Sequence, residues 1–550
     1  MNIKDLPCEL IFYILSQCEL IDAYHFMLYL EWPAEIIEKE LRRREDVYCY
    51  NGKKRAPRDA KNIIVERGNI FINEYSFCGY DNLISVIIPD TVSLISDYAF
   101  WGCCNLTNVI ISDGVISIGK SAFAECSNLK SIIIPDSVIS INENAFYLCS
   151  SLVSVTITSN IISISAFAFT NCKKLASITI PKGVTSIGKF AFCGCTKLAS
   201  ITIPEGVTSI GKFAFANCSE LASITIPEGV TSIDKGTFKE CNKLVSITIP
   251  KSVTSIEEEA FRSCQSLKEV IIPAGVTSIG KYAFCTCHSL EKISIPSGVT
   301  SIGKYTFCDC QSLKKISIPS GVTSIDEYAF RGCDNLVTVA IPIGVTSIGK
   351  YAFKECDNLV SVSIPNSVTS IGIAAFSMCT SLVSITIPGS VFSIDKSVFK
   401  NCTGLTTVTI EEGVTSIGDF AFAKCTNLRS ITIPDGVTSI GNHAFPECSS
   451  LRSITIPDSI TSIGLFAFVS CINLVSVNIP KSTTSISNFT FWGCINLVSV
   501  DIPESIVSIG EGAFRSCIRL KTIIPNSVTS IGTHAFWRCP NVITNHEKTL

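Results

Sequence analysis

The sequence predicts a repeat solenoid, in which one short structural unit stacks on the next along most of the chain. Three observations predict it. A phenylalanine recurs every 23 residues from Phe77 to Phe514, and Phe536 follows after 22. A cysteine follows that phenylalanine by three residues in twenty repeats, and a short β-branched segment precedes it. A fixed period of this size is typical of about 21 stacked coils that bury their apolar faces against one another.

The first element of each coil is expected to be a short β-strand. In the repeat that begins at Leu221, residues 223–226 alternate polar and β-branched apolar side chains, a pattern typical of a strand with one buried face. Pro227 has no N–H to donate to the next coil, so the strand should end there. Gly229 should form the turn that follows, because glycine adopts positive φ freely.

A second extended segment and a turn should complete the coil. Val230 and Ile233 should face inward from that second segment. Phe238 and Cys241 are three residues apart, so from Lys235 onward the spacing predicts a helical turn with both side chains on one side. Equivalent side chains of successive parallel coils should then lie about 4.8 Å apart.

The sequence has 28 cysteines, and the twenty that follow the repeat phenylalanine are expected to be buried free thiols. Disulfides that staple loops in small secreted domains have irregular spacings. Here one cysteine occupies the same place in each coil from Cys103 to Cys539, and only the first coil has Tyr80 instead. This regular file is better explained as a small apolar core position with a weak S–H donor.

The repeat carries a family resemblance. Leu-x-x-Ile-x-Ile-Pro, Val-Thr-Ser-Ile-Gly and Ala-Phe-x-x-Cys, repeated over residues 61–543, resemble the BspA-type (treponemal) leucine-rich repeat. The resemblance implies a leucine-rich-repeat β-solenoid that is a non-enzymatic binding or adhesion module. Many members of that family are secreted or displayed on cell surfaces.

The chain ends do not carry the repeat. Residues 1–48 are expected to form a small helical segment, with helices near residues 6–15, 20–30 and 34–44. Residues 49–60 are expected to be a charged linker, and residues 544–550 a polar tail. A solenoid exposes an apolar edge at its end, and the N-terminal helices could cap it.

The N-terminal segment also carries a resemblance of its own. The pattern Leu-Pro-x-Glu-Leu-x-x-x-Ile-Leu resembles the start of an F-box, although the usual Val-Cys-x-x-Trp ending is absent. The resemblance implies that these helices bind a Skp-family adaptor of a cullin ubiquitin ligase. A plain helical cap is the alternative. The residues that carry the resemblance are Leu6, Pro7, Glu9, Leu10, Ile14 and Leu15.

Composition and motifs argue against several function classes. The net charge of −3 gives no broad electrostatic attraction for nucleic acid, and no apolar run is long enough to cross a membrane. No phosphate-binding loop, His-Glu-x-x-His motif or nucleophile elbow is present, so we expect no enzyme and no cofactor. Cys285, Cys287 and His288, with Cys308 and Cys310, are the best metal candidates. We expect no metal there, because two of these thiols belong to the regular file.

Charged residues on the exposed side of the strands mark a candidate partner-binding surface. Most outward strand positions carry small polar side chains, and stacked charges there would steer an acidic partner. A solvated surface that suppresses aggregation is the alternative. The charged residues are Lys268, Glu269, Glu291, Lys292, Lys314, Lys315, Arg429 and Arg452.

Together these observations predict a non-catalytic protein that recognises a protein partner along the strand face. The F-box-like segment would recruit that partner to a ubiquitin ligase. The N-terminus lacks the apolar core of a secretion signal, so we expect an intracellular, cytoplasmic protein. The alternative is a cell-surface adhesion or scaffold protein whose N-terminal helices are only a cap.

Overall fold

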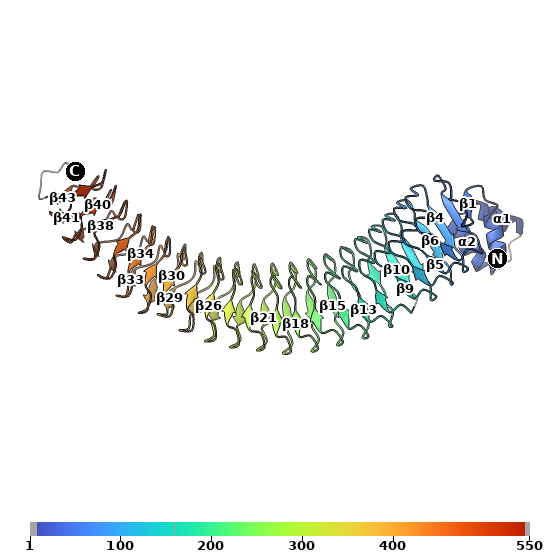
Figure 1. The fold of residues 1–550 in the computed structure, drawn as a ribbon, viewed down its shortest axis with the longest axis horizontal. Coiled ribbons are helices and arrows are strands. Elements are labelled where there is room, and N and C mark those ends of the chain that lie inside the picture. The colour runs from blue at the N-terminus through green and yellow to red at the C-terminus, as the bar shows by residue number, and fades with distance from the viewer. Residues whose placement is uncertain (1–7, 159, 545–550) are drawn as a thin grey trace. The chain divides into compact units, whose positions relative to one another are not determined.

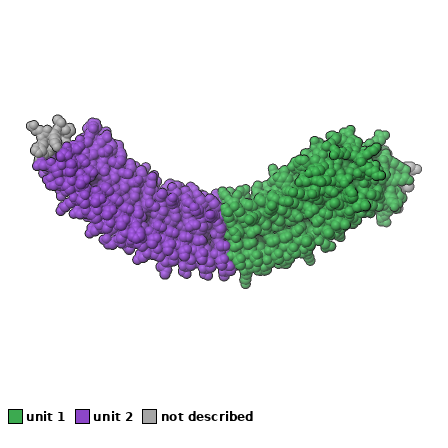
Figure 2. Space-filling model, in the orientation of Figure 1, with its two compact units in different colours: residues 1–267 green, residues 268–550 purple. Residues whose placement is uncertain are grey.

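The computed structural model describes residues 8–158 and 160–544. The chain divides into two units, residues 1–267 and residues 268–550 (Figures 1 and 2). In both units equivalent strands of successive coils pair in parallel and in register, as Ile224 with Ile247 and Ile293 with Ile316. The predicted solenoid with a 23-residue period is confirmed.

Unit 1 contains three helices and the first coils. The helices are α1 (Cys8–Gln17), α2 (Leu20–Tyr29) and α3 (Ala34–Leu41). The first strand of each coil and the edge strand β1, together called first strands, are β1 (Val47–Tyr50), β2 (Asn62–Val65), β4 (Ser85–Ile88), β6 (Asn108–Ile111), β8 (Ser131–Ile134), β10 (Ser154–Ile157), β12 (Ser177–Ile178), β15 (Ser223–Thr225) and β17 (Ser246–Thr248). The second strands are β3 (Phe71–Ile72), β5 (Leu94–Ile95), β7 (Ser117–Ile118), β9 (Ser140–Ile141), β11 (Ser163–Ile164), β13 (Ser186–Ile187), β14 (Ser209–Ile210), β16 (Ser232–Ile233) and β18 (Ser255–Ile256).

Unit 2 repeats the same two ladders. Its first strands are β19 (Glu269–Ile271), β21 (Lys292–Ser294), β23 (Lys315–Ser317), β25 (Thr338–Ala340), β27 (Ser361–Ser363), β29 (Ser384–Ile387), β31 (Thr407–Ile410), β33 (Ser430–Thr432), β35 (Ser453–Thr455), β37 (Ser476–Asn478), β39 (Ser499–Asp501), β41 (Lys521–Ile524) and β43 (Asn541–Thr544). Its second strands are β20 (Ser278–Ile279), β22 (Ser301–Ile302), β24 (Ser324–Ile325), β26 (Ser347–Ile348), β28 (Ser370–Ile371), β30 (Ser393–Ile394), β32 (Ser416–Ile417), β34 (Ser439–Ile440), β36 (Ser462–Ile463), β38 (Ser485–Ile486), β40 (Ser508–Ile509) and β42 (Ser530–Ile531).

The prediction of a helical turn before each cysteine is wrong. Residues 235–240 form consecutive tight turns instead. Gly236 and Glu240 both have φ of 62°, which interrupts a right-handed helix. The N–H of Phe238 consequently donates to the carbonyl of Ala260 in the next coil, at 2.9 Å. The turns therefore form a third line of hydrogen bonds between coils.

The core is built from columns of identical side chains. The phenylalanine rings stack nearly parallel, with Phe100 and Phe123 centroids 5.0 Å apart and planes 1° apart. The file cysteines are buried from Cys103 to Cys517, and no cysteine of the described residues is paired in a disulfide. Burial raises the pKa of the Cys149 thiol to about 12. These thiols are dry core groups, as the spacing predicted.

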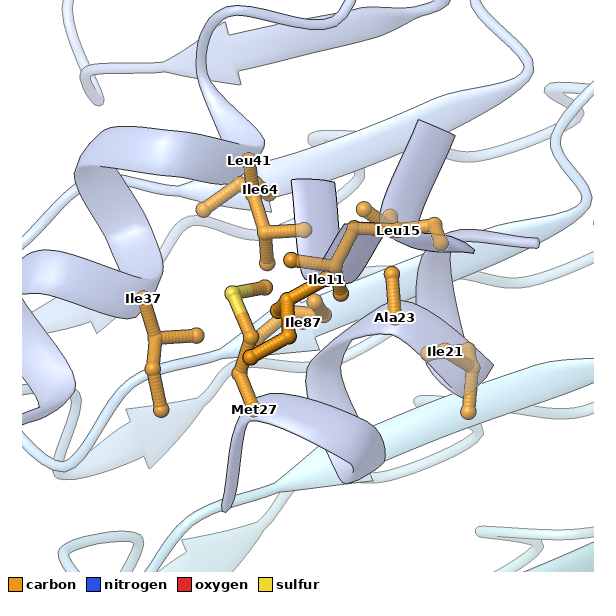
Figure 3. Packing of buried hydrophobic residues seen from close by; sticks show 10 residues of the cluster. Ile11, Leu15, Ile21, Ala23, Met27, Ile37, Leu41, Ile64 and Ile87 are labelled. Atoms are coloured by element: carbon orange, nitrogen blue, oxygen red, sulfur yellow. The ribbon is translucent and has the colours of Figure 1, made fainter. Parts of the chain in front are cut away.

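The N-terminal helices pack on the strand face of the first coils. Ile64 and Ile87, at outward positions of β2 and β4, are buried beneath Met27, Ile37 and Leu41 (Figure 3). These side chains form one apolar cluster with the buried side of α1. Covering of this face explains why β4 is buried at all four positions, whereas later first strands alternate buried and exposed.

The edge of the first coil is closed by a strand. β1 pairs in parallel with β2, from Val47 with Asn62 to Tyr50 with Val65. The Tyr50 ring packs edge-on against Phe77 with centroids 4.8 Å apart. β1 lies across the boundary that the sequence suggested between a helical segment and a charged linker.

Candidate protein-binding surfaces

The exposed side of the first strands in unit 2 is lined by two outward positions per coil, separated by a buried aliphatic side chain. At the N-terminal end of this face, Glu269, Lys292 and Lys315 are direct neighbours in the parallel ladder. One residue earlier in each coil lie Lys268, Glu291 and Lys314, all exposed. The structure therefore brings these six charged residues together, as the sequence suggested.

The charges within this group are partly neutralised. A Lys292–Glu269 ion pair has an N–O distance of 3.6 Å, and a Lys314–Glu291 pair has one of 3.4 Å. Both pairs are well exposed, so each contributes little to stability. Lys268 and Lys315 make no ion pair within the part of the chain that the structure describes. The group therefore presents a net positive charge.

The residue that immediately precedes most first strands forms a continuous column along unit 2, which we call the outer column. Its charged members flank an apolar centre of three exposed valines in consecutive coils, which are 41–45% exposed. Successive backbones are hydrogen bonded, as from the N–H of Val360 to the carbonyl of Val337 at 2.9 Å. The outer column consists of Lys268, Glu291, Lys314, Val337, Val360, Val383, Thr406, Arg429, Arg452 and Val475.

Arg429 and Arg452 stand beside each other at the far side of the valines. The N–H of Arg452 donates to the Arg429 carbonyl at 3.3 Å, and both side chains are exposed. Neither guanidinium is ion-paired within the described ranges 8–158 and 160–544. Sequence inspection singled out the charges but missed the valines, because an isolated exposed valine is unremarkable. Their 23-residue spacing was the signal that could have revealed them.

A hollow of about 570 Å³ lies further along the same face of unit 2, over β35, β37, β39 and β41. Its lining mixes aliphatic side chains with polar ones, among them Asn478, Asp501 and Lys521. The Asn478 amide donates to the Ile456 carbonyl at 2.6 Å and accepts from the Ile456 N–H at 3.0 Å. This side chain is therefore held by the sheet and does not face a partner freely.

Histidine and cysteine side chains of unit 2 lie in packed surroundings. His443 is sandwiched between Phe420 and Phe466, with ring centroids 4.7 Å away on each side. Burial lowers its pKa below the usual value. Cys285 and Cys308 are both buried, and no set of three potential metal ligands occurs in the described part of the chain.

The N-terminal helices expose an apolar surface on the side away from the strands. Leu10, Phe12 and Tyr13 of α1 are 43%, 45% and 63% exposed. Ile14 is half-buried, whereas Leu15 is buried in the cluster beneath the helix. Leu6 and Pro7 lie outside the described residues, as does the Glu9 side chain. Among the three F-box-like side chains that the structure describes, Leu10 is exposed, Ile14 is half-buried and Leu15 is buried.

The 23-residue coil corresponds to the repeat of a known protein family. A model of the BspA type leucine-rich repeat region, which spans six copies, matches residues 57–176, 162–290, 231–359, 323–451 and 415–543. These matches extend over nearly nine-tenths of the sequence. The chain belongs to the BspA-type leucine-rich repeat family.

Several solved structures resemble this BspA-type chain. A leucine-rich repeat protein from Bacteroides ovatus is 27% identical over 75% of this chain and 83% of its own, with a TM-score of 0.37. A leucine rich cell surface protein from Faecalibacterium prausnitzii is 28% identical over 75% and 87%, with a TM-score of 0.31. A T. pallidum leucine-rich repeat protein is 26% identical over 42% and 78%, with a TM-score of 0.23.

The family model begins at residue 57, so the N-terminal helices of the BspA-type chain lie outside its match. No curated protein matches the chain. No helix in the described residues is long and apolar enough to cross a membrane.

Proposed function

We propose that this chain is a non-catalytic recognition protein that binds a protein partner along the outer column of unit 2. The observation that supports this most is the run of Val337, Val360 and Val383 between charged groups. Interfaces commonly have an apolar centre and a polar rim, and energy concentrates at the centre. The partner would place an apolar segment on the valines.

The charge of the column suggests the chemistry of that partner. At one end Lys268 of the column and the adjacent Lys315 of β23 make no ion pair with any described residue, and at the other end Arg429 and Arg452 make none either. Cationic groups on both sides of an apolar centre favour a partner with acidic residues flanking an apolar stretch, and they would raise the association rate. The proposal therefore commits to an acidic protein surface.

Affinity capture with the full chain tests this proposal. A Val360→Asp chain should lose a partner that the native chain captures, because a carboxylate would replace the apolar centre and repel acidic groups. Thr225→Asp, an outward change in unit 1, is the matched control and should capture normally. Equal capture by the native and Val360→Asp chains would contradict the proposed surface.

We further propose that the N-terminal helices bind a Skp-family adaptor and so link the partner to a cullin ubiquitin ligase. The exposed Leu10 supports this, since a helix that served only as a cap would have no need of apolar side chains on its outer side. Purified adaptor should bind the native chain but not Leu10→Asp, whereas Ser16→Asp on the same helix should bind normally. Absence of adaptor binding to the native chain would leave these helices as a cap.

An intracellular, cytoplasmic location is part of the same proposal, because adaptor and ligase act there. A cell-surface adhesion or scaffold role is the alternative, since binding and adhesion roles are both implied by the family resemblance. Labelling of intact cells with an impermeant reagent separates the two. A labelled chain would favour the adhesion role, and a protected chain the adaptor role.

A further inference from the structure

The last coils of unit 2 depart from the repeat on the turn side, away from the strand face. The position directly after the core phenylalanine carries Trp492, Arg515 and Trp537 in three successive coils, and Arg538 follows Trp537. We call these four residues the Trp–Arg stack. Tryptophan or arginine stands at this position in three other coils, as Trp101, Arg262 and Arg331, each with a different residue type in the coils on either side. Only in the last coils do tryptophan and arginine follow one another in successive coils.

The four side chains form an alternating column. The guanidinium carbon of Arg515 lies 5.7 Å from the Trp492 ring centroid and 4.7 Å from that of Trp537. The guanidinium carbon of Arg538 lies 4.2 Å from the Trp537 centroid. These distances are within the range of cation–π contact. Trp492 also packs against Phe489, with centroids 5.8 Å apart.

The two arginines of this column have no acidic partner among the described residues. Neither Arg515 nor Arg538 makes an ion pair with any described residue. The Nε atom of Arg515 is shielded from solvent and has no hydrogen-bond partner in the residues that the structure describes. Glu511 is exposed four residues before Arg515 and forms no ion pair with it there. Such an unsatisfied group costs free energy unless a partner compensates it.

The indole rings lie close to both guanidinium groups and restrict where these side chains can move. Because an arginine that stacks on an indole uses the face of its plane, its N–H groups point outward along the edge of that plane. An edge of this kind accepts a carboxylate with two parallel hydrogen bonds. Holding the side chain in place beforehand also lowers the entropic cost of binding.

Apolar surface accompanies these cations. Trp492 and Trp537 are 38% and 39% exposed. Ile472, Ile495 and Ile518 occupy one position in three successive coils and are all exposed. Each isoleucine directly follows the file cysteine of its coil, on the same turn side. Tryptophan and arginine are the residues most enriched where binding energy concentrates in protein interfaces.

We propose that the Trp–Arg stack is a second protein-binding site, which takes an acidic segment containing an apolar side chain. Carboxylates would bind the edges of Arg515 and Arg538, and the apolar side chain would pack on an exposed indole. Single-stranded nucleic acid also stacks on aromatic rings, but it requires a cationic groove along its backbone. The net charge of −3 and the few cations here favour the protein segment.

The test is a random peptide array probed with the labelled full-length chain. Bound peptides should be enriched in Asp or Glu beside Leu, Phe or Trp. The enrichment should disappear with Arg515→Gln/Arg538→Gln and persist with Arg429→Gln/Arg452→Gln, which alters the strand face. This pair separates the two surfaces, so failure of one proposal is distinguishable from failure of the other.

The dissociation constant of one selected peptide, measured for the native chain and its variants, gives the size of the effect. The strongest peptide, synthesised separately, should bind the Arg515→Gln/Arg538→Gln chain about tenfold or more weakly, as expected for loss of charge-assisted hydrogen bonds. Arg515→Lys should also weaken binding, because lysine keeps the charge and loses the planar edge. Circular dichroism should show all variants folded. The proposal is overturned if no acidic peptide is enriched, if enrichment survives the double substitution, or if single-stranded RNA binds instead at this site.

Discussion

The Sγ atom of Cys218 lies 3.2 Å from the carbonyl oxygen of Phe192 in the preceding coil. The same carbonyl accepts the N–H of Cys195 at 3.1 Å. The thiols of the regular file thus donate weak hydrogen bonds to the preceding coil. The acceptor is the carbonyl oxygen of the core phenylalanine that lies 26 residues before the cysteine, as seen from Cys103 to Cys517. A small side chain that can donate a hydrogen bond is therefore useful at this position. With alanine there, the phenylalanine carbonyl would keep only the bond from the backbone N–H of its own coil.

The buried file should resist thiol reagents in the native protein. At neutral pH a charged, water-soluble disulfide reagent should modify the exposed Cys104 quickly and leave Cys149 and Cys218 unmodified, because burial keeps them neutral and inaccessible. In denaturant all 28 cysteines should react. Rapid modification of most thiols without denaturant would contradict the packed core.

Alkaline pH should destabilise the fold. The pKa of Cys241 rises from a usual 9.0 to about 12 on burial, so its thiol ionises in the unfolded chain first. Stability should be unaffected below about pH 8 and should fall above pH 9 by ~1.4 kcal/mol per pH unit for each such thiol. Thermal unfolding between pH 7 and about pH 10.5 measures this. Cys241→Ala should show a shallower alkaline decline than the native chain, and equal slopes would argue against the assignment.

Truncating one core ring should be costly. Phe330 stacks between Phe307 and Phe353 at centroid distances of 5.4 and 5.2 Å and is fully buried. Phe330→Ala should lower the free energy of unfolding by about 3–5 kcal/mol, as in other large cores. Tyr328→Ala in the same coil removes a half-exposed stacked ring and should cost about 1 kcal/mol. Urea denaturation compares them, and equal costs would contradict the distinction between core and surface columns.

The helices should make one strand position intolerant of charge. Ile87 and Ile133 occupy the same outward position, but Ile87 is 5% exposed under the helices and Ile133 is 62% exposed. Ile87→Asp should destabilise the N-terminal coils by several kcal/mol, because a buried unpaired carboxylate is strongly unfavourable. Ile133→Asp should be nearly neutral. Hydrogen exchange of β2 and β4 would detect the difference, and equal protection in both variants would contradict the packing.

The lysines at the N-terminal end of the strand face in unit 2 should act mainly on association rate. Replacing Lys292, Lys314 and Lys315 together by serine removes three positive charges from the strand face. Association with an acidic partner should slow at low salt and converge with the native rate at high salt. Stopped-flow or surface-binding kinetics across ionic strengths measures this. An unchanged rate at low salt would defeat electrostatic steering by this end of the face.

Much of the coil could be predicted from residues alone. Strict alternation in Ser223–Thr225 predicted the strand face, and the spacing of Phe238 and Cys241 predicted that both are buried. Spacing could not distinguish a helical turn from consecutive tight turns, because both place residues three apart on one side. The left-handed backbone at Gly236 and Glu240 decided that point, since their own N–H groups donate to carbonyls of the next coil.

The candidate surfaces were predictable only in part. The charged residues of β21 and β23 were visible in the sequence, and the structure places them together. The apolar centre at Val360 and the stacking of Arg515 between Trp492 and Trp537 depend on which columns face outward and which rings meet. Such neighbours are 22 or 23 residues apart in sequence, so they become evident once the coil pitch is known.

By itself the sequence determined the repeating coil, its period and its dry columns, because each coil carries the same local pattern and buries it against an identical neighbour. Only the tertiary structure decided which outward positions are covered. Ile64 and Ile87 look like exposed strand residues in the repeat, yet the helices of residues 8–41 bury them. Burial there depends on packing between segments of different pattern, and no periodicity within the coil encodes that contact.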